Sequence, residues 1–308
     1  MITRSTCFVA ACLAGQGLGP SGRPYSVPFE TPLLHYIVER DGDRNLPKNI
    51  ALSRRAYDFG LYFYRKRDLK RAREALDAAL RFDASYPLAY TARCTVRSEM
   101  GDHRGAIEDA SRAIDLDPHM AEAYFNRGVA YGRLREWARA ESDYAEALRL
   151  APKLGNGMAH NNLGSALMAQ GKLDAAIESF SKALELNPRN ALSVFNRSLA
   201  HERSGHLDEA MTDLNATLLL VDGFVEAYHR RALLFARKGL DQRALEDLNA
   251  VIRRDPKDLV ALADRALLHE RLGNANAAQL DFKRFSELSA EDPRKIDREK
   301  HMRLFLAN

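Results

Sequence analysis

Cysteine is scarce in this sequence, whose 308 residues include three: Cys7, Cys12 and Cys94. Three cysteines cannot form the paired framework that stabilises small secreted domains. A reduced Cys packs like a small apolar residue, and we expect Cys94 to be buried in that way. The fold is therefore expected to be held together by packing rather than by disulfides.

Long apolar runs and the motifs of common enzymes are also missing. No stretch of about 20 apolar residues is present, so no transmembrane helix is expected. Two His-Glu pairs, at His201 and His269, look like the start of a zinc-binding helix, but Gly205 and Gly273 stand where the second His ligand would be. No phosphate-binding loop or nucleophile motif occurs. We therefore expect no catalytic residue, no metal and no cofactor, and predict that the protein is not an enzyme.

The net charge of +4 is not spread evenly along the chain. Residues 53–292 carry 36 Lys and Arg against 36 Asp and Glu, and the excess lies mostly in residues 293–308. A protein that binds nucleic acid is expected to present a basic face, because neutralising phosphates drives that binding. A nucleic-acid partner is therefore not expected.

A 34-residue unit accounts for most of the chain and occurs seven times, with one interruption in phase at Gly155 and Asn156. Its twentieth residue is always Ala, as expected where two helices cross so closely that only a methyl group has room. In five units a Gly follows the first half, where a left-handed residue would end a helix. The units are 53–86, 87–120, 121–154, 157–190, 191–224, 225–258 and 259–292, and the invariant residues are Ala72, Ala106, Ala140, Ala176, Ala210, Ala244 and Ala278.

In its clearest copy, residues 121–154, the unit resembles the tetratricopeptide repeat. That repeat has an aromatic, a small residue and an aromatic on one helix, then Ala, an aromatic, Ala and Pro on a second. These places hold Tyr124, Gly128, Tyr131, Ala140, Tyr144, Ala147 and Pro152. The resemblance implies an all-α fold, a right-handed superhelical solenoid of about seven helix-turn-helix repeats with a C-terminal capping helix. It also implies a non-enzymatic scaffold or adaptor for other proteins.

Four regions are expected along the chain. Residues 1–14 form a candidate leader, in which Val9 to Cys12 resembles a bacterial lipobox and Cys12 would carry a lipid anchor. The alternative is a disordered cytoplasmic leader. Residues 15–52 are expected to be a Gly- and Pro-rich linker and an N-terminal cap, and residues 53–292 are the repeats. Residues 293–308 place apolar side chains among Lys and Arg, as expected of a capping amphipathic helix.

The seventh and twenty-third residues of the unit vary together. Five repeats have Arg and Asp at these places, and the two that lack the Arg also lack the Asp. This pattern predicts an ion pair between the two helices of one repeat, partly removed from water, that fixes their register. The predicted pairs are Arg93 with Asp109, Arg127 with Asp143, Arg197 with Asp213, Arg231 with Asp247, and Arg265 with Asp281.

The resemblance also implies a concave groove lined by the first helices. Three successive repeats have Asn at the sixth position, which faces this groove, and a side-chain amide can bond both the C=O and the N–H of an extended peptide. We expect Asn162 and Asn196 to be the stronger pair, with Phe195 in apolar contact. The clamp for chaperone tails in some family members needs two Lys that are missing here. The candidate peptide-binding residues are Phe125, Asn126, Asn161, Asn162, Phe195, Asn196, His229 and Arg230.

Together these features predict a scaffold that binds a protein or an extended peptide in the groove. If residues 1–14 direct export, the expected location is the bacterial periplasm or envelope, and the role is envelope assembly. The alternatives are a soluble cytoplasmic scaffold and a regulatory subunit that acts on an enzyme partner. No motif identifies the partner.

Overall fold

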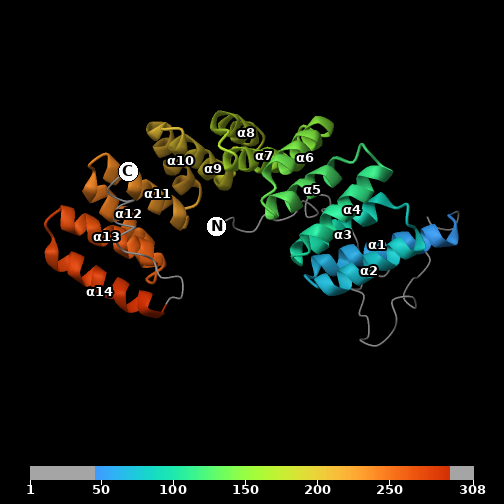
Figure 1. The fold of residues 1–308 in the computed structure, drawn as a ribbon, viewed down its shortest axis with the longest axis horizontal. Coiled ribbons are helices and arrows are strands. Elements are labelled where there is room, and N and C mark those ends of the chain that lie inside the picture. The colour runs from blue at the N-terminus through green and yellow to red at the C-terminus, as the bar shows by residue number, and fades with distance from the viewer. Residues whose placement is uncertain (1–45, 292–308) are drawn as a thin grey trace. The chain divides into compact units, whose positions relative to one another are not determined.

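The computed structural model describes residues 46–291, which form fourteen α-helices and no β-strand (Figure 1). Each repeat is a helix, a short turn and a second helix, so the predicted all-α solenoid of seven helix-turn-helix repeats is confirmed. The helices are α1 (Lys48–Arg65), α2 (Leu69–Phe82), α3 (Pro87–Glu99), α4 (His103–Leu116), α5 (Ala121–Arg133), α6 (Trp137–Leu150), α7 (Met158–Ala169), α8 (Leu173–Leu186), α9 (Ala191–Arg203), α10 (Leu207–Leu220), α11 (Val225–Arg237), α12 (Asp241–Arg254), α13 (Leu259–Arg271) and α14 (Ala275–Glu291). The right-handed superhelix and the limits of the four regions stay predictions.

The chain divides into two compact units between Ala175 and Ala176, within α8. In the first unit α1 to α7 pack in chain order, and the first helices α1, α3, α5 and α7 also contact one another in succession. These first helices therefore form one layer. In the second unit α9 to α14 pack in the same order.

Small residues allow the two helices of a repeat to cross closely. The invariant Ala at the twentieth position is 0–2% exposed in all seven repeats, which agrees with its steric explanation. At the eighth position, a Cβ added to Gly128 would lie 2.8 Å from Cε1 of Tyr144, closer than real Cβ atoms approach. Cys94 holds the same position in repeat two and is completely buried, as predicted.

The turn inside each repeat needs a left-handed residue. The five predicted turn glycines have φ between 69° and 86°, a region that Gly enters without steric cost. The predicted helix ends are thereby confirmed. Repeats one and three have Arg67 and Arg135 at this place, with φ of 62° and 60°. A residue that carries a Cβ is strained there by about 1–2 kcal/mol.

Replacing Arg135 by Gly is therefore expected to raise the free energy of unfolding by about 0.5–1 kcal/mol, since relief of strain exceeds the added chain entropy. Arg135 is exposed, so little packing is lost. Urea unfolding followed by circular dichroism measures the change. Arg135→Ala is the control, because Ala keeps the Cβ and should give no gain. A lower urea midpoint for Arg135→Gly than for the wild type would contradict the claim that the backbone of Arg135 is strained.

The two residues inserted after repeat three form a tight turn. Leu154–Gly157 is a 3-10 turn (η4), in which Gly155, Asn156 and Gly157 have φ of 69°, 48° and 92°. Three left-handed residues in succession explain the composition, because Gly and Asn tolerate this region best. Buried Leu154 anchors the turn before α7 begins at Met158.

Several expectations concern residues outside the described range. The lipobox-like Val9 to Cys12 with its lipid anchor, the Gly- and Pro-rich linker, and the capping helix at residues 293–308 all lie there. α1 begins at Lys48, five residues before the first repeat as counted from the sequence. Within residues 46–291 no helix has both the length and the apolar character needed to cross a bilayer.

Candidate functional site

The five predicted ion pairs are present, and each joins the two helices of one repeat. In repeat three, Nε and Nη2 of Arg127 donate to the two carboxylate oxygens of Asp143 at 2.8 and 2.9 Å. The five Asp residues are 2–5% exposed, so the prediction of pairs removed from water is confirmed. The same two-bond contact, at 2.6–2.9 Å, is made by Arg93, Arg197, Arg231 and Arg265.

Each of these arginines also reaches back to the preceding repeat, a contact that was not predicted. Nη1 of Arg127 donates to Oγ of Ser111 on α4 at 3.1 Å. The acceptor stands at the twenty-fifth position of its repeat in all five cases. Repeat four has Leu163 instead of the Arg. The repeat before it, repeat three, has Ala145 at the twenty-fifth position, which offers no acceptor. The twenty-fifth residue of one repeat therefore varies together with the seventh residue of the next. This covariation could have predicted the contact from the sequence. The other four acceptors are Asp77, Ser181, Asn215 and Asn249.

One arginine thus ties three helices together. Hydrogen bonds to Asp143 raise the pKa of Arg127, while burial acts in the opposite direction. A two-bond contact between Arg and a carboxylate is among the stronger polar contacts in proteins. The cost of removing both charges from water offsets much of that gain, so the net contribution to stability is modest. We therefore expect these pairs to fix the register of the helices, and a partner to bind elsewhere.

Both aromatic residues expected on the groove face are buried in the core. Phe125 is 1% exposed and packs against Tyr144, with ring centroids 5.7 Å apart. Phe195 is 9% exposed, and its ring centroid lies 4.8 Å from that of Phe224. Burying such large rings stabilises a core strongly, and each ring fills space inside its unit. The expectation that both are exposed in a groove is wrong.

Two of the four expected amides are used inside the protein. Asn126 is 5% exposed, and its Nδ2 donates to Oγ1 of Thr95 in the preceding repeat at 3.1 Å. Asn161 is 6% exposed, and its Nδ2 donates to Oδ1 of Asn162 at 3.4 Å. Asn162, in the first unit, and Asn196, in the second, are half-buried. Of the three Asn residues predicted at the sixth position, Asn126 is therefore not accessible to a peptide, and Asn162 and Asn196 stay candidates.

The last two predicted residues connect neighbouring first helices of the second unit. Nε2 of His229 on α11 lies 2.6 Å from Oδ2 of Asp264 on α13, and Asp264 is completely buried. Arg230 on α11 is exposed, and its Nη1 lies 3.6 Å from Oε1 of Glu202 on α9. These contacts hold α9, α11 and α13 side by side.

Leucine and arginine recur on these three first helices, a feature that was not predicted. The ninth position of repeats five to seven is always Leu and the thirteenth is always Arg. Repeat one has the same combination in Leu61 and Arg65, whereas repeats two to four have no Leu at the ninth position. Residues four apart lie on the same side of a helix. Leu199 and Leu233 are half-buried, and Arg203 and Arg237 are exposed. We call these four residues the leucine–arginine stripe. In repeat seven, by contrast, Arg271 is paired with an Asp of the preceding repeat.

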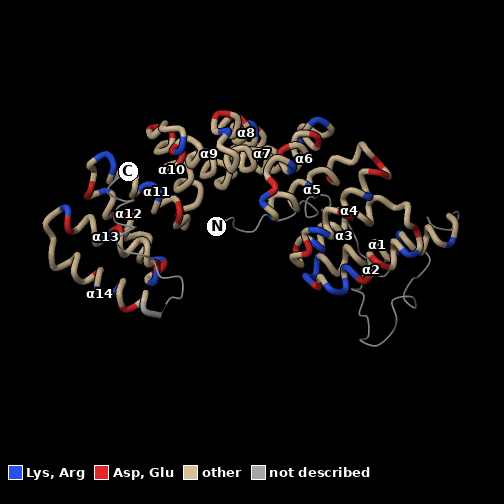
Figure 2. Tube along the Cα trace, viewed as in Figure 1, with Lys and Arg blue, Asp and Glu red and all other residues tan. Residues whose placement is uncertain are grey.

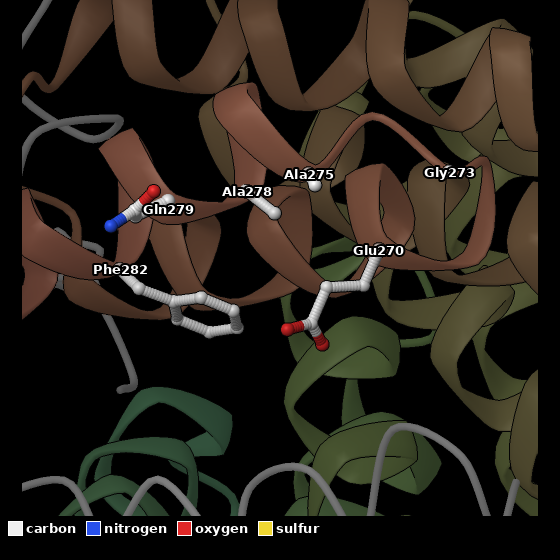
Figure 3. A pocket seen from close by; sticks show the side chains of 6 residues that line it. All are labelled: Glu270, Gly273, Ala275, Ala278, Gln279 and Phe282. Carbon is white, nitrogen blue, oxygen red and sulfur yellow. The ribbon is translucent and has the colours of Figure 1, made fainter.

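A pocket lies beside the turn between α13 and α14 (Figure 3). Ala278 and Phe282 form an apolar part of its wall, near the carboxylate of Glu270. Its lining offers one carboxylate and no second acid, base or nucleophile, so it has no pair of groups for catalysis. Among residues 46–291 no three His, Cys, Asp or Glu side chains are grouped so that they could hold a metal ion. The lining residues are Glu270, Gly273, Ala275, Ala278, Gln279 and Phe282.

Helix pairs that repeat every 34 residues and pack in chain order around invariant alanines define a helical-repeat scaffold. Three stretches, at residues 95–154, 158–190 and 225–258, match family models described as tetratricopeptide repeat. These three stretches are tetratricopeptide repeats, as the resemblance of the sequence implied.

Curated relatives share the repeats over part of their length. Tetratricopeptide repeat protein 6 of Homo sapiens is 27% identical over 164 residues, which is 53% of this chain and 31% of that protein. Small glutamine-rich tetratricopeptide repeat-containing protein 2 of Mycosarcoma maydis is 32% identical over 99 residues, or 32% of this chain and 27% of that protein. The chain spans about a third or less of the length of these relatives.

Solved structures share the fold. YrrB, described as a TPR protein with an unusual peptide-binding site, is 25% identical with a TM-score of 0.53, covering 62% of this chain and 97% of YrrB. PilW, described as a type IV pilus biogenesis factor, is 20% identical with a TM-score of 0.61, covering 66% of this chain and 94% of PilW. At 20% identity the likeness to PilW concerns the fold alone.

Proposed function

We propose that this protein is a non-enzymatic scaffold that binds an extended protein segment on the first helices of its second unit. The observation that carries the proposal is the leucine–arginine stripe, which repeats on two adjacent first helices, α9 and α11. The description of YrrB as having a peptide-binding site supports a peptide as the ligand. Asn196, on α9 with the stripe, would add a polar contact to the main chain of the segment.

The chemistry of the stripe favours a partner segment that combines apolar and acidic residues. Half-buried Leu199 and Leu233 can cover apolar side chains, whose removal from water contributes about 25 cal/mol per Å². Arg203 and Arg237 are exposed, and each guanidinium can bond a carboxylate through two parallel N–H groups. The spacing of the two pairs follows from the packing of α9 beside α11, which the contact between Arg230 and Glu202 supports.

A phage-displayed peptide library selected on the full chain tests this proposal. Selected peptides should combine Asp or Glu with large apolar residues. The variant Arg203→Gln with Arg237→Gln should weaken such a peptide at least tenfold, because charged hydrogen bonds contribute about 1.5–3 kcal/mol each. Fluorescence anisotropy with a labelled peptide measures the affinity. Arg112→Gln with Arg253→Gln is the matched control, since both side chains are exposed on second helices.

Three outcomes would count against the stripe. The first is a set of selected peptides without acidic residues, and the second is a control variant that loses affinity as strongly as the stripe variant. The third is a selected peptide that loses affinity with Asn162→Ala alone and is unaffected by the stripe variant. That result would move the site to the first unit, where Asn162 was predicted to bind.

A further inference from the structure

The turn between α1 and α2 carries a concentration of positive charge that no other repeat has. Residues 65–73 include six Lys and Arg and one Asp, a net charge of +5, whereas the corresponding nine residues of the other six repeats range from −1 to +2. Figure 2 shows Lys and Arg gathered where these two helices are joined. We call Arg65, Lys66, Arg67 and Lys70, which are all exposed, the basic turn.

Neighbouring acidic groups neutralise only a small part of this charge. Nη1 of Arg67 lies 3.3 Å from Oε2 of Glu99 in repeat two. Arg65, Lys66 and Lys70 have no acidic partner within ion-pair distance among residues 46–291. A structural ion-pair network therefore does not account for these three cations.

Aromatic side chains lie directly beside the basic turn. Tyr62 and Phe63 at the end of α1 are half-buried, with ring centroids 5.4 Å apart. Nζ of Lys66 lies 6.0 Å from the centroid of Tyr62, and the guanidinium carbon of Arg71 lies 5.7 Å from that of Phe63. Basic side chains next to aromatic rings are typical of surfaces that bind at the headgroup level of a bilayer.

We propose that the basic turn binds an anionic lipid surface. A surface of headgroups needs to reach only this one turn, and Lys and Arg near such a surface each contribute to binding. A long polyanion, in contrast, would extend onto repeats whose charges balance, where acidic side chains repel it. The inference is independent of the proposed peptide site, because none of the residues of the stripe takes part.

Sedimentation with lipid vesicles tests the proposal. The wild-type chain should bind vesicles of phosphatidylcholine containing about a third phosphatidylserine, and should not bind pure phosphatidylcholine. The variant Arg65→Gln, Lys66→Gln and Lys70→Gln should lose binding by roughly a hundredfold, since each charge contributes about fivefold. Raising the salt to about 1 M should also release the wild type, because the screening length falls to about 3 Å.

The control variant carries Arg112→Gln, Arg189→Gln and Arg253→Gln. It loses the same charge from three exposed, dispersed places, and its binding should stay within a few-fold of the wild type. The proposal is overturned if the wild type ignores anionic vesicles, binds neutral ones equally, or loses binding as strongly in the control variant. It is also overturned if polyglutamate or single-stranded DNA, but no vesicle, binds through Arg65, Lys66 and Lys70.

Discussion

Replacing Asp143 by Ala is expected to lower the free energy of unfolding by about 3 kcal/mol, and the midpoint of thermal unfolding by roughly 6–12 °C. Asp143 is 5% exposed and accepts two hydrogen bonds from Arg127. When the carboxylate of Asp143 is removed, the partly buried guanidinium of Arg127 keeps its charge but has lost the partner of opposite charge. An unpaired charge that is partly removed from water is destabilising. Thermal and urea unfolding followed by circular dichroism measure the loss.

Repeat four suggests the matched control for this change. It has Leu163 and Ser179 where repeat three has Arg127 and Asp143, so the family of repeats within this chain already contains an uncharged alternative. The double variant Arg127→Leu with Asp143→Ser should therefore cost clearly less than Asp143→Ala alone, since no unpaired charge remains. If the double variant is the less stable of the two, the pair contributes more than its desolvation costs, and the register explanation fails.

Replacing Phe125 by Ala is expected to cost about 3–5 kcal/mol of unfolding free energy, because it leaves a cavity in the core of repeat three. Phe125 is 1% exposed and packs against Tyr144, whose own contacts would weaken. Urea unfolding and hydrogen exchange of the amides in α5 and α6 measure the effect. Loss of protection should be greatest in these two helices, since stability is local in repeat arrays.

Phe125→Leu is the control, because it keeps most of the apolar volume and should cost much less than Phe125→Ala. The comparison also decides whether Phe125 acts as a core residue or as a groove residue. A core residue affects unfolding in proportion to the volume removed. Replacing a groove residue would leave the free energy of unfolding unchanged and weaken only the binding of the partner. That result would support the expectation that Phe125 lies exposed in the groove.

The repeat architecture could be predicted from the sequence alone. Seven copies of one unit provide an internal alignment, so the invariant Ala and the paired Arg and Asp stand out without any related sequence. Both features depend on contacts inside one repeat, 16 residues apart in the case of the ion pairs. The invariant Ala recurs in all seven copies and the ion pair in five, with both partners missing from the other two, which is why the fold and the pairs were predicted correctly.

Contacts between repeats were decided by the tertiary structure. Asn126 is buried because its side chain contacts Thr95 on the first helix of the preceding repeat, so a helical position that looks exposed in a single repeat is covered by its neighbour. The bond from Arg127 to Ser111 likewise joins two repeats. The period and the register followed from the sequence because they are local properties of one unit. Which side chains stay accessible followed only from stacking, because accessibility belongs to the assembled layer of first helices.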